Sequence, residues 1–382
     1  MQPSDPKHAS TSALSTHSAD LLRQARRLPK VLLHEHLDGG LRVATLLGLL
    51  RERGLPSPAP DEETLGAWFD ARAHAGSLTE YLRGFDLTVA AMATPEALAR
   101  VAFEAAEDAR ADGCVLAEFR IAPLLFEPFG VPGAVAVQAL LDGLSRCPLP
   151  SGLIICALRH ESDAQIERAA HLALQFHAQP AQHDRPDAAR VLGFDLAGPE
   201  AGWPASRHAA LLARVRAAGL GLTLHAGEAD TGERVLEAAR LGAQRIGHGV
   251  RLADLITAKG HGSAQAEAVL AELRRHHIHL EICPTSNLHT GVCASLALHP
   301  IHALWRAGVG LSFHTDNQLM SRVDHSTEAA NLLRAGFGWD ELLHMGLDAA
   351  AASFMPPAAR HKARDALLAW GLAQGITPAR PG

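Results

Sequence analysis

The alternation of short apolar runs with longer helical patterns constrains the fold of this chain more than any other feature. Eight apolar runs of strand length follow residue 30, and each precedes at least one helical pattern. We expect strands at Val31–His34, Cys114–Ile121, Gly152–Leu158, Val191–Leu196, Leu220–His225, Arg245–His248, His279–Cys283 and Val309–His314. Strands that alternate with helices pair in parallel, because a parallel pair needs a crossover. Eight such units predict a closed (β/α)₈ TIM barrel.

The chain is longer than a minimal barrel, and the excess is helical. A barrel typically takes about 250 residues, whereas this chain has 382. Extra helices are expected after the first strand, over residues 43–112, and at the C-terminus, after the last strand. The alternative, an open doubly wound sheet, would carry a GxGxxG turn after its first strand, and Asp38-Gly39-Gly40 does not fit that pattern. We therefore expect a single barrel domain over residues 21–377, behind a disordered leader over residues 1–20.

Composition argues against several classes of partner and location. The net charge is -6 and no basic block occurs, so we expect no nucleic-acid partner. The five cysteines are odd in number and form no CxxC, which argues against a disulfide framework and favours a reducing, cytoplasmic compartment. The leader lacks the apolar core of a signal peptide, and no apolar run is long enough to cross a membrane, so we expect no membrane partner. The sequence does not indicate the oligomeric state.

Residue types that bind metals lie at the ends of several predicted strands. His34 and His36 end the first strand, His225 ends the fifth, and Asp316 follows the eighth. Residues two apart in a strand point to the same face, so a His-x-His pair can aim both rings at one ion, although an isolated pair is more often a surface accident. In a barrel these strand ends meet at the face that carries the chemistry. Three imidazoles and one carboxylate predict one catalytic zinc ion with a position open for water.

Other residues at the ends of the predicted strands could transfer protons. Zinc lowers the pKa of its bound water to about 7, and attack by the resulting hydroxide also needs a proton donor. Glu228 follows His225 closely enough to be that acid, although glutamates in the first turn of a helix are common for electrostatic reasons. His248 lies between two glycines, which favours a ring that meets substrate over a packed one. Asp316 can both bind the metal and accept a proton from its water.

Two other strand ends line the same expected rim. Gly198 can offer its backbone N–H to a planar ligand, or it can be an ordinary turn glycine. Cys283 could be a catalytic cysteine, but no histidine is obviously paired with it. A small buried hydrophobic side chain is therefore the preferred interpretation of Cys283.

Seven motifs in order identify the chain as similar to a known family. They are HEHLDGGLR (34–42), EFRIAP (118–123), GFDLAG (193–198), HAGE (225–228), GHG (247–249), CPTSN (283–287) and TDN (315–317). Together they resemble the adenosine and adenine deaminases, over about residues 29–373, and the TDNQLMS form resembles the bacterial branch. The resemblance implies a zinc-dependent (β/α)₈ hydrolase of purine salvage. Such an enzyme replaces the 6-amino group of adenosine or deoxyadenosine with oxygen and releases ammonia.

The resemblance also implies a role for each matching residue. It implies zinc ligands at His34, His36, His225 and Asp316, and protonation by Glu228 of the purine nitrogen beside the reacting carbon. His248 and Asp316 would orient and deprotonate the water. His36 and Asp38 would line the substrate site, with Asp38 at the ribose. Gly198 would contact the purine through its backbone, and Asn317 would meet the imidazole edge of the purine.

Two positions depart from the family pattern. Asn317 stands where many members carry a second aspartate, and an amide both donates and accepts whereas a carboxylate only accepts. Asn317 therefore keeps open an alternative substrate, either free adenine or another 6-aminopurine nucleoside. His314 stands where a smaller polar residue is more common, and the sequence gives no reason for it.

Other classes of function fit the sequence less well. The zinc deaminases that act on cytidine carry an HxE and a PCxxC, and neither occurs here. A two-metal amidohydrolase would have a bridging lysine near the fourth strand, and none lies in Val191–Gly198. A non-catalytic purine- or metal-binding module remains as an alternative from another class. We also expect residues 43–112 to form part of a lid over the site, with Phe69, Tyr81 and Phe85 as its apolar contacts.

Overall fold

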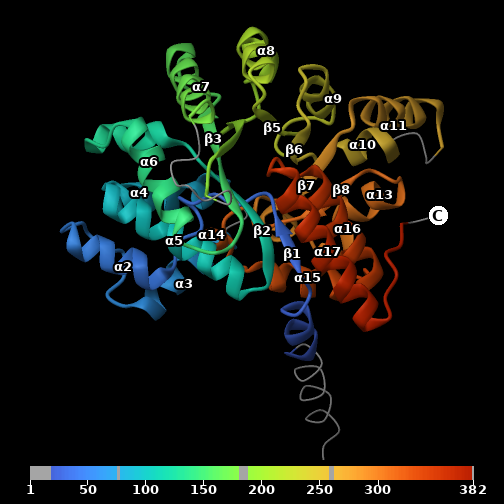
Figure 1. Ribbon diagram of the computed structural model, residues 1–382, viewed down its shortest axis with the longest axis horizontal. Helices are drawn as coiled ribbons and strands as arrows, with labels where there is room; N and C mark the ends of the chain where they lie inside the picture. Colours follow the sequence, from blue (N-terminus) through green and yellow to red (C-terminus); the bar gives the residue numbers. More distant parts are fainter. Residues whose placement is uncertain (1–18, 75–77, 180–187, 258–261, 381–382) are drawn as a thin grey trace, which may run out of the picture.

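Eight parallel strands form one sheet whose order follows the chain (Figure 1). A computed structural model describes residues 19–74, 78–179, 188–257 and 262–380. The strands are β1 (Lys30–Leu32), β2 (Cys114–Ile121), β3 (Ser151–Leu158), β4 (Val191–Ala197), β5 (Gly221–Ala226), β6 (Arg245–His248), β7 (His279–Ile282) and β8 (Leu311–Phe313). Each strand pairs in parallel with the next one. The predicted (β/α)₈ barrel is confirmed, and all eight predicted strands occur within a few residues of their expected bounds.

The barrel closes between its first and last strands, just beyond the ends of both. Glu35 and Asp316 form a parallel bridge there, in which the His36 N–H donates to the Asp316 carbonyl over 2.7 Å and the Asp316 N–H donates to the His34 carbonyl over 3.0 Å. Two residues before this bridge in each segment, the Leu33 N–H donates to Nδ1 of His314 over 3.2 Å. The imidazole of His314 thus replaces a main-chain acceptor at this seam, which accounts for a residue that the sequence left unexplained.

Helices surround the strands on the outside (Figure 1). After β2 they are η1 (Pro123–Phe129), α6 (Gly133–Ser145), α7 (Asp163–His177), η2 (Ala205–His208), α8 (Ala209–Ala217), α9 (Glu233–Arg240), α10 (Leu252–Thr257), α11 (Ala264–His276), α12 (Pro284–His289), η3 (Leu296–Leu298), α13 (Ile301–Arg306), α14 (Gln318–Ser321), α15 (His325–Arg334), α16 (Trp339–Ala352) and α17 (Pro357–Gln374). Most of these helices pack apolar side chains into one large hydrophobic core around the strands. The buried apolar side chains of α17 belong instead to a second cluster, with Val31 of β1 and Leu116 of β2.

The segment between α16 and α17, residues 353–356, packs against the amino ends of the strands. A Cβ on Gly193 or Gly221 would press against the ring of Phe354, so both strands need glycine at this close approach. Glu118 accepts hydrogen bonds from Ser353 Oγ (2.6 Å) and from the Phe354 N–H (2.7 Å). The predicted C-terminal helices therefore close the end of the barrel opposite to the expected site.

The predicted insert after β1 consists of α2 (Val43–Glu52), α3 (Glu62–Ala73), α4 (Leu78–Met92) and α5 (Pro95–Ala111). The sequence did not predict α3, because its apolar residues lack a clear helical period, yet Asp61 caps it by accepting the Thr64 N–H over 2.8 Å. Phe69 of α3 and Met320 of α14 would both crowd a Cβ at Gly84 of α4. The insert thus packs directly on the segment that follows β8.

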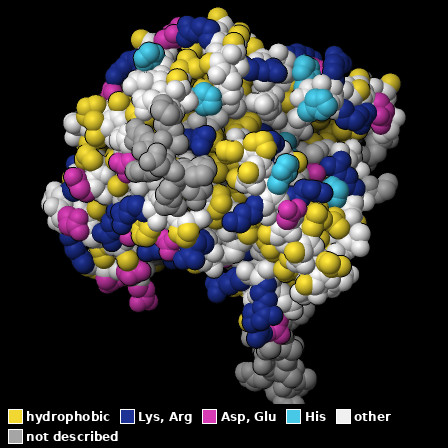
Figure 2. All heavy atoms as spheres, in the orientation of Figure 1, with side chains coloured by type: hydrophobic (Ala, Val, Ile, Leu, Met, Phe, Trp, Pro, Cys, Tyr) yellow, Lys and Arg dark blue, Asp and Glu magenta, His cyan; other side chains and the backbone are white. Residues whose placement is uncertain are grey.

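Some expectations fall outside the described residues. Residues 1–18 of the expected leader and the side chain of Tyr81 are not described, whereas Phe69 is buried and Phe85 half-buried. The lid itself stays a prediction. On the face shown in Figure 2, basic side chains of the described residues are interspersed with acidic and apolar ones.

Among the described residues, no single helix is both long and apolar enough to cross a membrane. The pair η1 and α6, bent by 119°, meets the length and composition only when both helices are taken together.

Candidate active site

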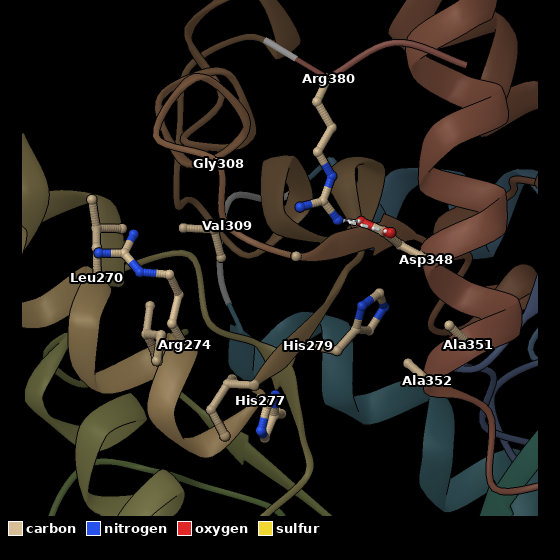
Figure 3. A pocket seen from close by; sticks show the side chains of 13 residues that line it. Leu270, Arg274, His277, His279, Gly308, Val309, Asp348, Ala351, Ala352 and Arg380 are labelled. Carbon is tan, nitrogen blue, oxygen red and sulfur yellow. Dashed lines mark hydrogen bonds and ion pairs between the residues drawn. The ribbon is translucent and has the colours of Figure 1, made fainter. Parts of the chain in front are cut away.

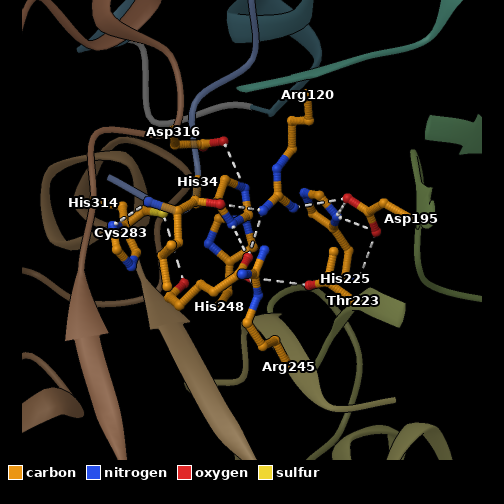
Figure 4. Close-up of polar contacts among 12 residues, drawn as sticks. His34, Arg120, Asp195, Thr223, His225, Arg245, His248, Cys283, His314 and Asp316 are labelled. Carbon is orange, nitrogen blue, oxygen red and sulfur yellow. Dashed lines mark hydrogen bonds and ion pairs between the residues drawn. The ribbon is translucent and has the colours of Figure 1, made fainter. Parts of the chain in front are cut away.

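Four side chains that could hold a metal ion converge at the carboxyl ends of the strands (Figure 4). They are His34, His225, His248 and Asp316, and one ligand atom from each lies within 4.8 Å of the others. His36 joins this group, because its Nε2 lies 3.4 Å from His225 Nε2 and 3.6 Å from Asp316 Oδ1. The structure therefore brings together all four predicted zinc ligands, with His248 beside them.

The donor atoms of this group fit a bound cation. Nε2 of His34 is fully buried, lacks a hydrogen-bond partner and lies 3.3 Å from Asp316 Oδ1. His248 differs, because its Nδ1 faces the amide Nδ2 of Asn287 over 3.1 Å. An amide nitrogen only donates, so a neutral His248 ring with this contact carries its proton on Nε2. That tautomer makes His248 Nε2 a donor rather than a metal ligand, and leaves His34, His36, His225 and Asp316 as a set that suits zinc.

Two buried carboxylates hold the outer nitrogens of the metal-site histidines. Asp195 lies 2.9 Å from Nδ1 of His225, and Glu281 lies 2.9 Å from Nδ1 of His34. A carboxylate at Nδ1 fixes the proton there, so that Nε2 presents a lone pair to the cluster. The sequence placed Asp195 at a strand end without giving it this role, and Glu281 was missed altogether.

A buried arginine links the two carboxylates to each other. Arg120 pairs with Asp195 over 2.8 Å (Figure 4). It also pairs with Glu281 over 2.6 Å and donates to the Leu33 carbonyl over 2.8 Å. Burial alone would raise the pKa of Asp195, but His225 and Arg120 outweigh that effect and hold it well below the usual range. For Glu281 the same opposition, with Arg120 and Arg245 as the main cations, again leaves a strongly lowered pKa.

A second arginine extends this network down the barrel interior. Arg245 forms ion pairs with Glu281 over 2.6 Å and with Glu118 over 2.7 Å, and all three side chains are fully buried. Glu118 and Arg120 lie two apart in β2, so their side chains share its inner face. Two opposite charges at this spacing in an apolar strand were the signal in the sequence that could have revealed the network.

Glu228 lies on the loop between β5 and α9, with its carboxyl held by α12 and the residue after it. Its Oε1 accepts hydrogen bonds from Thr290 Oγ1 (3.0 Å) and Asn287 Nδ2 (3.2 Å). Its Oε2 lies 3.5 Å from Nε2 of His248. Helix α9 begins only at Glu233, so Glu228 is not a first-turn glutamate of that helix. Sequence reasoning had noted the CPTSN motif at the rim but had not connected Asn287 or Thr290 with Glu228.

Asp316 and His248 adopt an uncommon backbone conformation. Their φ angles are 63° and 62°, in the left-handed region that non-glycine residues rarely enter. Ser286 Oγ donates to Oδ2 of Asp316 over 2.6 Å, which leaves Oδ1 turned to the histidines. Strain of this kind persists where the surrounding contacts impose it, and it is common at functional sites.

Two of the predicted substrate residues, Asp38 and Asn317, carry buried polar atoms without a partner. Oδ1 of Asp38 and Oδ1 of Asn317 are buried without a hydrogen-bond partner, and burial raises the pKa of Asp38 to about 7. Gly198 directly follows β4 and has a φ of 84°, where glycine is favoured. Cys283 is fully buried, and burial raises the pKa of its thiol well above the usual value. A buried, protonated thiol fits the preferred structural interpretation of Cys283.

A cavity of about 560 Å³ lies elsewhere, at the amino ends of β7 and β8 (Figure 3). Arg274, His279, Asp348 and Arg380 line it, and Arg380 is paired with Asp348 over 2.9 Å. In (β/α)₈ enzymes the chemistry occurs at the opposite, carboxyl face. We therefore assign the candidate active site to the histidine cluster rather than to this cavity.

Comparisons with known proteins found similarity over most of this chain. A family model described as adenosine deaminase matches residues 29–370. The adenosine deaminase of Mycobacterium tuberculosis is 40% identical over 351 residues, which cover 89% of this chain and 93% of the relative. The adenosine deaminase of Mycobacterium marinum is 40% identical over 348 residues, which cover 88% and 92%.

Solved structures of similar proteins share the fold at lower identity. Adenine deaminase from Arthrobacter aurescens has a TM-score of 0.76 at 24% identity, covering 90% of this chain and 99% of that one. An amidohydrolase from Burkholderia ambifaria, solved with bound Zn, has a TM-score of 0.76 at 22% identity and covers 93% of both chains. Arabidopsis ADAL, in complex with IMP, has a TM-score of 0.74 at 23% identity and covers 92% and 99%.

Proposed function

This chain belongs to the adenosine deaminase family, and from that membership we propose that it hydrolyses adenosine and deoxyadenosine to inosine and deoxyinosine with release of ammonia. One observation carries the proposal: the carboxyl group of Glu228 lies beside the cluster of histidines and Asp316 at one end of the barrel. The mycobacterial relatives bear the name of this activity and are similar over most of their length.

We assign one zinc ion to His34, His36, His225 and Asp316, because the unpartnered Nε2 of His34 and the carboxylates behind two of the rings fit such an ion. A zinc ion at this place supplies the Lewis acidity that makes water a nucleophile at neutral pH. Oδ1 of Asp316 faces the cluster and can accept the proton of that water. His248, whose Nδ1 is held by the amide of Asn287, can donate from Nε2 a hydrogen bond that orients the water.

Glu228 supplies the proton that the purine ring needs. Attack at the carbon that bears the amino group breaks the aromatic system, so the neighbouring ring nitrogen must gain a proton in the same step. Oε1 of Glu228 already accepts from Thr290 and Asn287, which places a carboxyl proton on Oε2. That proton passes to the ring nitrogen. The amino group then takes up the proton held by Asp316, the carbon–nitrogen bond breaks and ammonia leaves. The hydroxyl group gives its proton back to Glu228 as the carbonyl of inosine forms.

The unused acceptors at the rim suit a nucleoside. Asp38 offers a buried oxygen to a ribose hydroxyl, and the backbone of Gly198 and the amide of Asn317 face the base by family resemblance. Asn317 is also the reason to keep free adenine, or another 6-aminopurine nucleoside, as the second candidate substrate. Its amide can donate to a ring nitrogen that a carboxylate would repel.

The test is ammonia release from adenosine, deoxyadenosine, adenine and a 5′-modified adenosine, with metal-replete and chelated protein. Turnover of adenosine and deoxyadenosine that is lost on chelation and restored by zinc is the expected result. Turnover of adenine alone, or of the modified nucleoside alone, would replace the proposed substrate but keep the chemistry. Stoichiometric zinc without turnover of any aminopurine would contradict the proposal and favour a binding module.

A further inference from the structure

The loop that carries Glu228 is wrapped around the side chain of Glu200. Four consecutive backbone N–H groups, from Gly227 to Asp230, donate to its two carboxylate oxygens. Gly227 donates to Oε1, and the next three residues donate to Oε2 over 3.0, 2.9 and 3.1 Å. Glu200 is buried, with 6% of its surface exposed. Successive N–H groups arranged in this way form a nest that binds an anion, and here the anion is a side chain of the same protein.

The nest depends on the backbone conformation of the loop. Gly227 has a φ of 69°, which turns its N–H toward the same point as those that follow. A Cβ at this position would lie 2.6 Å from Cγ2 of Val235, so a larger residue would push the loop away from Glu200. Helix α9 begins at Glu233 and has Gly232 as its N-cap, so the four N–H groups do not belong to a helix end. Without Glu200 they would lose their charged acceptor.

Glu200 also stands beside a second substrate-contacting segment. It lies two positions after Gly198, the residue of positive φ that directly follows β4. Arg159 stiffens this corner, because its guanidinium donates to the carbonyls of Leu196 (2.6 Å), Trp203 (3.3 Å) and His225. One side chain therefore ties the end of β4 to the loop after β5.

We propose that Glu200 is a positioning residue that sets Glu228 relative to Gly198, so that both engage the same purine ring at once. The inference rests on the proposed function, in which Gly198 meets the base and Glu228 protonates it. The backbone of Glu228 is fixed by Glu200, and its carboxyl is fixed separately by Asn287 and Thr290. Glu200 itself touches neither the metal cluster nor the reacting atoms.

A double-mutant cycle with Glu200→Gln and Glu228→Gln tests this coupling, with single-turnover measurement where activity is low. The amide of E200Q is isosteric but turns a donor toward the N–H groups. We expect kcat to fall by about 10- to 100-fold, because small misplacements of a catalytic group have effects of that size, with KM changed less than about threefold and bound zinc unchanged. In the E228Q background the same substitution should alter kcat by less than about twofold, because residues that act as a unit are non-additive.

Two further variants make the result specific. Glu272→Gln is the matched control, since both carboxylate oxygens of Glu272 accept from Arg240 (2.6 and 3.0 Å) between the outer helices α9 and α11, and the change should leave kcat unchanged. Glu200→Asp keeps the charge and should retain more activity than E200Q. If E200Q does not fold, E200D is carried through the same cycle.

The outcomes separate the inference from the function on which it rests. Additive losses in the cycle, loss of zinc in E200Q, or an equal effect of E272Q would each overturn the positioning role. Failure of the unmodified protein to deaminate any nucleoside would instead overturn the proposed function. An active protein with an additive cycle would refute the inference alone.

Discussion

Replacing Asp195 by asparagine separates what the buried carboxylate does for the metal from what it does for the fold. The substitution keeps the size of the side chain but removes its charge and one of its two acceptor oxygens. Asp195 holds Nδ1 of His225 at 2.9 Å and pairs with Arg120 at 2.8 Å. The variant therefore weakens the orientation of one metal ligand and removes one of the two carboxylates that neutralise Arg120.

The two effects differ in size. Loss of a partner behind a metal-binding histidine lowers metal affinity by about 10- to 100-fold, which is roughly 1.4 to 2.7 kcal/mol. Breaking a buried ion pair costs about 3 to 5 kcal/mol. Arg120 keeps Glu281 at 2.6 Å, so we expect the lower end, about 3 kcal/mol. A protein with the usual 5 to 15 kcal/mol of stability remains folded after such a loss.

Two measurements separate these effects. Zinc affinity is measured by competition with a chelator at pH 7.5, and the free energy of unfolding is measured in urea on the metal-free proteins. Asp108→Asn is the control, because it breaks an exposed pair with Arg42 at 2.6 Å and should cost less than about 1 kcal/mol. If D195N binds zinc within about twofold of the unmodified protein, the carboxylate does not orient His225. If the free energy of unfolding of D195N is lowered no more than that of D108N, the buried pair with Arg120 adds no stability.

Three other substitutions test separate parts of the structure. Glu228→Gln should keep zinc and lower kcat by about 10²- to 10⁴-fold, because an amide cannot deliver a proton; zinc content and turnover measured together check this, and joint loss would mean that Glu228 is misassigned. Gly39→Ala puts a Cβ against Oδ1 of Asn317 and should raise KM for adenosine by about tenfold; an unchanged KM would remove Asn317 from the substrate site. Burial raises the pKa of Glu328 from its ordinary 4.5 to about 8. Between these pH values the folded protein holds a proton that the unfolded chain has released. The stability that comes from the protonated carboxyl group is therefore complete below pH 4.5 and is lost as the pH rises to 8. Glu328→Gln should therefore gain up to roughly 4 kcal/mol in free energy of unfolding relative to the unmodified protein between pH 5 and pH 8, and equal pH profiles of urea unfolding would contradict the raised pKa.

The sequence predicted the barrel and the converging residues for one physical reason. Alternating strands and helices force parallel pairing, and parallel strands in a closed sheet bring all their carboxyl ends to one face. His34, His225 and Asp316 could therefore be expected to meet without knowledge of the contacts between them. The structure brings them together, with Glu228 and His248 alongside.

The parts that escaped prediction depend on pairings across long sequence separations. Arg120 and Glu281 lie 161 positions apart, and only the register of the closed barrel brings them into contact. The same holds for Glu200, whose four donors follow it by 27 to 30 positions on the next loop. Helix α3 was missed for a local reason, since it lacks a clear apolar stripe and depends on the cap at Asp61 and on burial of Phe69.

The contacts between the first and last strands join segments that the ribosome synthesises at very different times. Leu33 and His314 meet across the seam although 281 positions separate them, and Glu35 bridges Asp316 at its upper end. A nascent chain therefore carries His34, His36 and His225 long before the ribosome has released the strand that closes the sheet and delivers Asp316. Until then the sheet has two open edges and an incomplete set of donors. The closed barrel and the complete metal-binding group therefore both require the last strand and Asp316, which follows it.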